Sequence, residues 1–397
     1  MIAWLMATVL AAMPPNVRVT TLSEETIAGS LKEFTGTTIT VDVAGTPRVI
    51  PQKDLKEIIL DENDAPPAEA AATMTLTLND TSQIGCTQFT ATGQKLTASV
   101  TGLGELALGR NAIRSVRFAE LSPKVAARWD ELSVRDAQTD LVVIRKGDAL
   151  DFVVGTLSEI QAEKVEILVK SKAVVVPRDR VFGLVFGKSN TALGKPVCEV
   201  ITQNGNKFRL QTVAVTGLDT LTGKTATGID VKLPLSTLKK IDFTLGRIRY
   251  LADLPEEAEY KSEGLVRSEF VLQVRKNRTS GNTPLKLAGN VEFTRGLWIH
   301  SGTTLKYRLN REFRRFVTTA GVDRSSPACD QFQTSVRLIV TGDGKSLLNR
   351  EFQWNDAPAA LELDVGGVRD LTIQVEPIGK TSGICEHLDL GDARVVQ

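Results

Sequence analysis

Short runs in which apolar and polar residues alternate recur along most of the chain. Examples are Thr38–Val43 (TITVDV) and Lys164–Val169 (KVEILV). A period of two places alternate side chains on opposite faces of a strand, so these runs predict half-buried β-strands. Because the runs are short and numerous, we predict an all-β fold.

Four six-residue runs share one pattern, with apolar residues at the first, fourth and sixth positions. They are residues 55–60 (LKEIIL), 113–118 (IRSVRF), 181–186 (VFGLVF) and 238–243 (LKKIDF). They follow one another at similar intervals along the chain, and this self-similarity indicates repeated modules. About five short strands in each module can close into a small SH3-like or Sm-like barrel. The predicted modules are residues 17–60, 73–119, 141–187 and 197–246.

Three stretches interrupt this pattern. Residues 120–140 have helical composition after a Ser122-Pro123 start and predict a helical linker, in which Trp129 is interpreted as a packing residue. Residues 61–72 are rich in alanine, proline and acidic residues, which is typical of a linker. Residues 247–261 are predicted to link the last module to a C-terminal domain, residues 262–397.

The C-terminal domain continues the alternating pattern. Two antiparallel sheets packed face to face would bury its apolar positions. These positions are Leu305, Tyr307, Leu309, Phe316, Val336, Leu338, Val340, Leu371, Ile373 and Val375. The pattern therefore predicts a β-sandwich after the modules.

Composition restricts the partners and the compartment. The chain of 397 residues has 48 Lys and Arg against 47 Asp and Glu. This balance gives no reason to expect the basic surface that nucleic-acid binding requires. Residues 1–13 form an apolar run followed by prolines and predict a signal peptide; a buried N-terminal strand or a wrongly assigned start is the alternative. The run is shorter than the ~20 residues that span a bilayer, and no later stretch is a transmembrane candidate. We therefore expect a secreted or periplasmic protein.

Several motifs occur in a fixed order near the C-terminus. They are residues 295–301 (RGLWIHS), 321–323 (GVD), 336–345 (VRLIVTGDGK) and 386–395 (EHLDLGDARV). Their order resembles the NPCBM domain, a carbohydrate-binding module first noted beside catalytic domains of glycoside hydrolase family 98. The resemblance implies a galactose-binding-like jelly roll and a carbohydrate ligand, with galactose-type glycans as candidates. The whole arrangement resembles exported planctomycete-type proteins in which small barrel repeats precede an NPCBM domain.

The candidate sugar ligands come from these motifs. His300 and His387 are the only histidines, and a histidine can donate to a hydroxyl while it presents an amphipathic ring. Trp298 and Trp354 are candidate stacking platforms, with Trp354 expected in an exposed loop. The alternatives are a backbone hydrogen bond for each histidine and core packing for Trp298.

Carboxylates in the same motifs are candidates for both sugar and metal. Asp323, Glu386 and Asp389 are predicted sugar ligands, and together with Asp392 they are candidate ligands of a structural calcium ion, which takes ~6–8 oxygen atoms. Lectin-like jelly rolls often carry such an ion. The alternative is turn and strand-end chemistry, in which an aspartate accepts from its own backbone.

The four cysteines show no Cys-x-x-Cys spacing, so no zinc or redox motif is predicted. Cys329 follows the Gly-Val-Asp turn and Cys385 precedes the Glu-His segment. In an exported protein we expect these two to form a disulfide. Cys86 and Cys198 lie in different modules and are expected to be buried thiols.

Enzyme signatures are missing from the sequence. It has no Gly-x-Ser-x-Gly, His-Glu-x-x-His or phosphate-loop motif, and both histidines lie in one domain. We therefore predict a non-catalytic protein that binds glycan through its C-terminal domain, with the modules as spacers or as contacts for a protein partner. A structural or assembly protein, in which the sandwich contacts protein, is the main alternative. Hydrolase activity is a third hypothesis.

Overall fold

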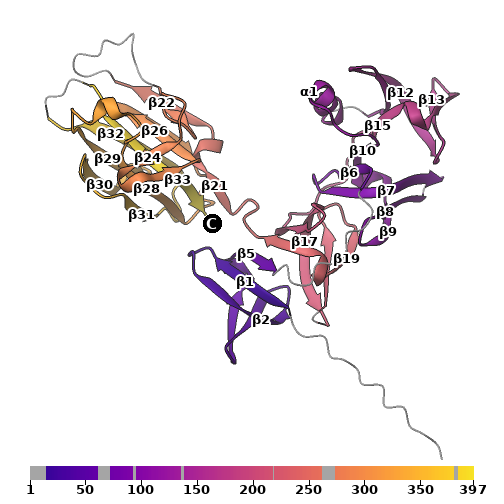
Figure 1. The fold of residues 1–397 in the computed structure, drawn as a ribbon, viewed down its shortest axis with the longest axis horizontal. Coiled ribbons are helices and arrows are strands. Elements are labelled where there is room, and N and C mark those ends of the chain that lie inside the picture. The colour runs from indigo at the N-terminus through magenta and orange to yellow at the C-terminus, as the bar shows by residue number, and fades with distance from the viewer. Residues whose placement is uncertain are drawn as a thin grey trace, which may run out of the picture. The chain divides into compact units, whose positions relative to one another are not determined.

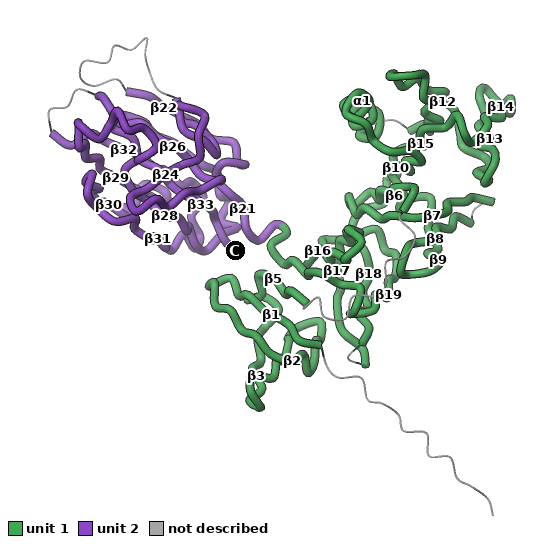
Figure 2. Tube along the Cα trace, in the orientation of Figure 1, with its two compact units in different colours: residues 1–245 green, residues 246–397 purple. Residues whose placement is uncertain are grey.

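The computed structural model describes residues 15–60, 72–92, 95–135, 138–217, 219–261, 273–379 and 383–397. The predicted signal peptide, residues 1–13, and residues 61–71 of the predicted linker lie outside the described residues. The chain divides into two compact units, residues 1–245 and 246–397 (Figure 2). The fold is all-β apart from one α-helix and short 3-10 helices in the described ranges (Figure 1).

Unit 1 contains four segments with the same order of elements, namely four strands, a 3-10 helix and a fifth strand. Segment 1 comprises β1 (Asn16–Thr21), β2 (Thr26–Phe34), β3 (Thr38–Val43), β4 (Thr46–Pro51), η1 (Gln52–Asp54) and β5 (Leu55–Leu60). Segment 2 comprises β6 (Met74–Leu78), β7 (Gln83–Thr92), β8 (Lys95–Val100), β9 (Gly104–Leu108), η3 (Arg110–Ala112) and β10 (Ile113–Arg117). Segment 3 comprises β11 (Asp140–Lys146), β12 (Ala149–Ile160), β13 (Lys164–Val169), β14 (Lys172–Pro177), η4 (Arg178–Arg180) and β15 (Val181–Val185). Segment 4 comprises β16 (Cys198–Thr202), β17 (Lys207–Thr216), β18 (Thr220–Thr225), β19 (Asp230–Pro234), η5 (Leu235–Thr237) and β20 (Leu238–Asp242).

The strands of every segment pair in one antiparallel order, fifth–first–second–third–fourth. Each second strand carries a register shift, for example between Leu31 and Glu33 in β2 and between Leu157 and Glu159 in β12. A bulge of this kind bends a strand and increases its twist, so each segment curls around its own apolar side chains. Closure of the segments as SH3-like barrels stays a prediction.

The segments are joined through their fifth strands. β5 pairs with β20, and β10 pairs with β15, both antiparallel. In the register, Ile58 lies opposite Ile241 and Val116 lies opposite Leu184. These four residues are the fourth positions of the repeated six-residue runs, so equivalent positions meet and each pair of segments has an approximate local two-fold axis.

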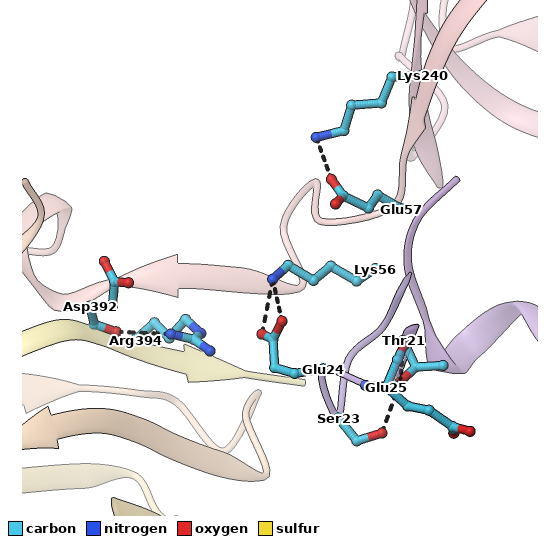
Figure 3. Close-up of polar contacts among 9 residues, drawn as sticks. All are labelled: Thr21, Ser23, Glu24, Glu25, Lys56, Glu57, Lys240, Asp392 and Arg394. Atoms are coloured by element: carbon cyan, nitrogen blue, oxygen red, sulfur yellow. Dashed lines mark hydrogen bonds and ion pairs between the residues drawn. The ribbon is translucent and has the colours of Figure 1, made fainter. Parts of the chain in front are cut away.

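Charged side chains flank the β5–β20 junction. Lys240 lies 2.6 Å from a carboxylate oxygen of Glu57 on the opposite strand (Figure 3). Lys56, next to Glu57, lies 2.7 Å from Glu24. Apart from Glu24, these side chains are half-buried, and they flank a backbone pairing in which the buried residues Ile58 and Ile241 lie opposite each other.

Buried polar side chains connect further segments of unit 1. The Asp140 carboxylate accepts from the backbone N–H groups of Leu157 and Gly187 at 2.7 and 2.8 Å and contacts Arg110 of segment 2. Asp80 of segment 2 accepts from the backbone N–H of Thr227 in segment 4 at 3.2 Å. A buried polar group is costly unless it is paired, so these residues favour one arrangement of the segments.

The helix α1 (Pro123–Ser133) begins with proline at its first position, where the missing N–H costs nothing. Val125, Trp129 and Leu132 form its buried face, with the spacing of an amphipathic helix. The Trp129 ring meets the edge of Phe182 at 5.4 Å and lies over Gly183, where a side chain would collide with it. Trp129 is therefore a packing residue, as predicted.

Unit 2 is a two-sheet β-sandwich. One sheet has the order β23-β26-β33-β28-β31, with β21 also paired to β33, and the other has the order β22-β27-β32-β29-β30. The strands of the first sheet are β21 (Ile248–Tyr250), β23 (Arg275–Lys276), β26 (Gly296–His300), β28 (Arg315–Val322), β31 (Ala359–Asp364) and β33 (His387–Val396). Those of the second are β22 (Glu256–Tyr260), β27 (Thr303–Arg308), β29 (Ser335–Gly342), β30 (Lys345–Gln353) and β32 (Asp370–Pro377). A separate hairpin consists of β24 (Leu285–Leu287), η8 (Ala288–Asn290) and β25 (Val291–Phe293), and two more 3-10 helices are η6 (Leu251–Asp253) and η9 (Pro327–Cys329).

The core of unit 2 follows the predicted alternation. All ten predicted core residues are at most 1% exposed. They meet Leu297, Ile299, Leu388 and Leu390 of the first sheet in one apolar cluster. At about 25 cal/mol per Å² of buried apolar surface, this cluster is the main source of stability of the sandwich.

The predicted linker at residues 247–261 is wrong for most of its length. Ile248–Tyr250 pairs with residues 394–396 of β33, and Glu256–Tyr260 pairs with residues 303–307 of β27. The residues between them, Leu251, Ala252 and Leu254, are buried in the sandwich core. A fragment that begins at residue 262 would therefore lack one strand from each sheet.

Among the described residues, no helix has the length and apolar character needed to cross a membrane.

Candidate functional site

Strand pairing brings the two histidine motifs together. β26 and β33 pair antiparallel, with Trp298 opposite Asp389 and His300 opposite His387. These four residues share one face of the sheet because side chains alternate along a strand. The rings of His300 and His387 are 5.2 Å apart, and the His387 ring lies 4.2 Å from that of Trp298. Since Leu297, Ile299, Leu388 and Leu390 fill the core on the other face, this polar row lies on the outer face of the sheet.

The β24–β25 hairpin covers part of this outer face. Glycines make room for it, since a side chain at Gly391 would collide with the Phe293 ring and one at Gly321 would lie 3.1 Å from Leu287. The backbone N–H of Lys286 donates to Asp389 Oδ2 at 3.1 Å. As a result the polar row is largely interior, with Trp298 only 1% and Asp389 0% exposed.

Two carboxyl groups lie side by side beneath the hairpin. Asp323 accepts from Trp298 Nε1 at 3.1 Å and from the backbone N–H and hydroxyl of Ser325, both at 2.9 Å. Burial, and then the neighbouring charge of Asp323, raise the pKa of Asp389 well above its ordinary value of 3.8, since both effects disfavour the charged form. Because Asp323 already accepts three hydrogen bonds, we assign the proton of the pair to Asp389, whose Oδ1 atom has no hydrogen-bond partner among the described residues.

This proton makes the stability of unit 2 depend on pH. The unfolded chain loses the Asp389 proton near pH 4 while the folded chain keeps it, so the unfolding free energy should fall as pH rises from about 4 toward the folded-state pKa, by up to about 1.4 kcal/mol per pH unit. Asp389→Asn mimics the protonated acid and should remove this slope. Urea unfolding of the full chain between about pH 4.5 and 6.5 checks it, with Asp392→Asn on the same strand as control. Parallel slopes for wild type and Asp389→Asn would contradict the assignment.

His387 lies in the same interior row. Burial, and secondarily the charge of His300, lower the pKa of His387 to about 3. Its Nε2 atom is buried and has no hydrogen-bond partner among the described residues. The ring is therefore neutral above about pH 3, and its main contact is the face of Trp298.

Glu386 and His300 fix the turns at the end of the row. Glu386, 2% exposed, accepts from the Ser301 hydroxyl at 2.6 Å and from the backbone N–H of Gly383 at 3.2 Å. The two ring nitrogens of His300 lie 2.6 Å from the carbonyl oxygen of Ser301 and 2.9 Å from that of Gly383. Both side chains thus hold the 383–386 turn against the end of β26.

The expectation of an exposed Trp354 is wrong. Trp354 is only 5% exposed. The Arg324 guanidinium lies 3.6 Å from the centre of its ring and donates to its carbonyl oxygen at 2.7 Å. An arginine stacked in this way is a favourable cation–π contact, and it closes the face that a sugar would need. Trp298 is also buried, so neither predicted platform is accessible.

The structure instead exposes an aromatic residue that the sequence analysis did not select. Phe332 is 42% exposed, and its backbone N–H donates to the carbonyl oxygen of Cys329. The predicted disulfide joins Cys329 to Cys385, with Cα atoms 5.5 Å apart. Next to Cys385 lies Ile384, 41% exposed. The signal in the sequence was an aromatic residue inside the polar run at residues 330–333 (DQFQ), which predicts exposure.

We call this surface the disulfide edge, defined by Phe332, Ile384, the Cys329–Cys385 disulfide and the His300 ring. Its parts are connected in space. The hydroxyl of Thr334 donates to the Cys385 carbonyl oxygen at 2.7 Å, and Gly383 contacts His300. Gln331 and Gln333, on either side of Phe332, are exposed. The edge therefore combines one aromatic face with amide groups that donate and accept.

The predicted calcium ligands do not fit a calcium site. Asp323 accepts from Trp298 and Ser325, burial raises the pKa of Asp389, and Glu386 accepts from Ser301 and Gly383. Asp392 makes backbone contacts, donating its N–H to Arg295 and accepting from Arg394 (Figure 3). In the part of the chain that the structure describes, no three His, Cys, Asp or Glu side chains converge as metal ligands.

The other two cysteines are buried free thiols, as predicted. Burial raises the pKa of Cys86 to about 11, although nearby Arg178 opposes the shift. The pKa of Cys198 is raised further by burial and by Asp242. A thiol is unreactive in this state because the thiolate is the nucleophile.

The fold and its outer-face row define a β-sandwich domain with a disulfide at one edge. Residues 248–396, which make up nearly all of unit 2, match the NPCBM/NEW2 domain family. Among curated proteins, none matches the chain.

Solved structures of carbohydrate-binding modules show distant likenesses. A CBM51 module from Clostridium perfringens GH95, in complex with methyl-galactose, is 18% identical and covers 38% of this chain and 99% of its own, with a TM-score of 0.32. The tandem CBM51 modules of Sp3GH98, a family 98 glycoside hydrolase from Streptococcus pneumoniae, are 14% identical over 96% of this chain and 99% of theirs, with a TM-score of 0.32. With TM-scores this low, neither likeness bears on what this chain binds.

Proposed function

We propose that unit 2 binds a glycan at the disulfide edge. The observation that carries this proposal is the exposed Phe332 ring, flanked by Gln331 and Gln333 and placed beside the His300 turn, in a domain that matches a carbohydrate-binding family. An aromatic face packs on the apolar face of a pyranose ring. Glutamine amides and backbone carbonyl groups pair with the hydroxyl groups.

The buried residues of the polar row have a positioning role in this proposal. Glu386 and His300 hold the 383–386 turn, and the disulfide ties that turn to the loop that carries Phe332. Asp323 and Asp389 lie further inside. A preformed edge reduces the entropy that a weak ligand must overcome on binding.

The rest of the chain is proposed to be non-catalytic. The segments of unit 1 would serve as spacers or as contacts for a protein partner. The disulfide supports an exported protein in an oxidising compartment. Galactose-type glycans are the first ligands to test. The alternative, a sandwich that contacts protein, is favoured by Ile384, because an apolar side chain beside Phe332 also suits a protein partner.

Phe332→Ala in the full chain tests the proposal. On a glycan array the wild-type chain should bind at least one glycan class, and the substitution should weaken that binding by about 2 kcal/mol, roughly thirtyfold in Kd, because a central aromatic contact is lost. Phe332→Tyr keeps the ring and should retain binding. Val291→Ala, on the exposed β25 strand, is the control for a general loss of apolar surface.

Two results would reject the proposal. One is a wild-type chain that binds no glycan on the array. The other is a Phe332→Ala chain that binds as tightly as wild type, which would move the site away from the disulfide edge. Since Phe332 is exposed, the substitution should leave the unfolding transition of unit 2 unchanged.

A further inference from the structure

Exposed apolar side chains concentrate in segment 3. Among the described residues, ten large apolar side chains are exposed, and four of them lie on β12, β13 and β14. These four, which we call the valine edge, are Val154 (40% exposed), Leu168 (37%), Val174 (37%) and Val175 (53%). Contiguous apolar surface on a soluble protein commonly marks an interaction site.

Most of the valine edge lies on one face. Leu168 on β13 is opposite Ala173 on β14, and Val175 is two residues further along β14. Thr156 on β12 is opposite Leu168, and Val154 is two residues before it. Because side chains two apart on a strand share a face, Val154, Leu168 and Val175 form one outer surface.

The strand at this edge has an open side. β14 pairs with β13, and no other described strand pairs with it. Backbone N–H and C=O groups along the outer side of β14 are therefore available to another strand. Proteins usually protect such edges with charge, proline or short length. Here Pro177 and Lys172 stand at the two ends, and Ala173, Val174, Val175 and Val176 lie between them.

The other segments provide an internal comparison. The position of Val175, two residues before the end of the fourth strand, is occupied by Val49 in segment 1, Leu106 in segment 2 and Lys232 in segment 4. Lys232 is a protective residue of the kind expected on a free edge. Val49 is exposed, but no other exposed large apolar residue lies in the described part of segment 1. Among the segments as described, only segment 3 has both an unpaired fourth-strand edge and several exposed large apolar side chains beside it.

The charge beside the valine edge is positive. Lys170 and Ser171 both have positive φ angles, which is typical of a tight hairpin turn. The turn between β13 and β14 therefore projects Lys170 and Lys172 into solvent, where both are exposed. Of the nearby acids, Glu159 pairs with Lys164 and Asp151 with Lys146, whereas Glu166, opposite Val175, accepts from the Ser158 hydroxyl and leaves one negative charge on this face.

We propose that β14 is a docking strand for an extended, acidic and apolar segment of a partner protein, which adds to the sheet beside β14. Strand addition satisfies the open backbone groups, the valine edge receives alternate apolar side chains, and Lys170 and Lys172 select acidic residues. A lipid surface would meet the positive charge and the valines, but it offers no partner for backbone N–H groups. A second copy that paired antiparallel through its own β14 would place the Lys172 end of one strand against the Pro177–Arg178 end of the other, where cationic side chains again meet.

The test uses the full chain and a synthetic probe, a capped peptide of alternating glutamate and valine. Hydrogen exchange should show protection of the β14 amides when this peptide is added. The same peptide with N-methylated valines cannot pair its backbone and should give no protection. Combined Lys170→Glu and Lys172→Glu substitutions should weaken binding roughly tenfold, since like charges then face each other. Val175→Thr should weaken it severalfold, and Val49→Thr, at the equivalent position of segment 1, should not change it.

Each contrary result has a distinct meaning. Equal protection by the N-methylated peptide would overturn strand addition. Co-sedimentation of the chain with phosphatidylserine vesicles, abolished by Val175→Thr, without peptide binding would replace the protein partner with a membrane. Concentration-dependent dimers in sedimentation velocity, lost in Val175→Thr, would make the partner a second copy. None of these outcomes bears on glycan binding at the disulfide edge, which the Phe332 variants test separately.

Discussion

Replacing Cys329 and Cys385 together by serine is expected to lower the free energy of unfolding of unit 2 by about 4 kcal/mol, the value that the chain-entropy model gives for a loop of this size. The disulfide joins residues 56 positions apart. In that model the closed loop removes conformational freedom from the unfolded chain, so the folded state gains in relative stability. Loss of the disulfide would also release the Phe332 loop from the 383–386 turn. We therefore expect the double variant to bind glycan more weakly at the disulfide edge, in addition to being less stable.

Hydrogen exchange of the full chain measures this effect, because it reports the amides of β28 and β33 separately from those of unit 1. Wild-type protein treated with a reductant should behave like the serine variant. Cys198→Ala removes a buried thiol from unit 1 and is the matched control, which should leave unit 2 unchanged. Equal protection of β28 and β33 in the oxidised chain and the double variant would show that the bond adds no stability.

Trp298→Ala should destabilise unit 2 by about 3–5 kcal/mol, the usual cost of deleting a large buried aromatic side chain. Trp298 is 1% exposed, its ring packs against His387, and its Nε1 donates to Asp323. Trp298→Phe keeps most of the ring but removes one donor to Asp323 Oδ2, which still accepts from the Ser325 hydroxyl, so the loss should be about 1 kcal/mol, the net value of one hydrogen bond. The difference between the two variants separates packing from hydrogen bonding.

Chemical unfolding of the full chain, followed by exchange at β26 and β33, gives both values. Trp129→Ala deletes another buried tryptophan, this one from unit 1, and should leave these strands unaffected. A loss below about 1 kcal/mol for Trp298→Ala, far under the usual cost of a core aromatic, would place the ring on an accessible surface. Trp298 would then return as a candidate stacking platform.

The sequence predicts most of the strand content because alternation is a local property. The ten core positions of the sandwich and the four equivalent runs of unit 1 all depend on spacing within a few residues. The 247–261 region could not be assigned in this way. Its strands are short and partly charged, for example Glu256–Tyr260, and they become strands only because β27 and β33 offer free edges.

The candidate site was only partly predictable. The motifs contain the residues of the polar row, and the register between β26 and β33 brings them together. Exposure depends on what covers each side chain, and that cover is distant in the sequence. The β24–β25 hairpin covers Asp389, and Arg324 covers Trp354. Local patterns carry no information on such cover, so the burial of Trp298, Asp389 and Trp354 could not be predicted from the sequence.

The pairing of fifth strands in unit 1 also sets an order of events during synthesis. The inner pair, Val116 with Leu184, closes a much shorter stretch of chain than the outer pair, Ile58 with Ile241. Loops that close over a longer distance form later. The β5 edge of a newly made chain therefore remains open while β10 and β15, which carry the same six-residue pattern, are already present as wrong partners. We expect β10 to pair with β15 first, which would leave β20 as the partner that remains for β5.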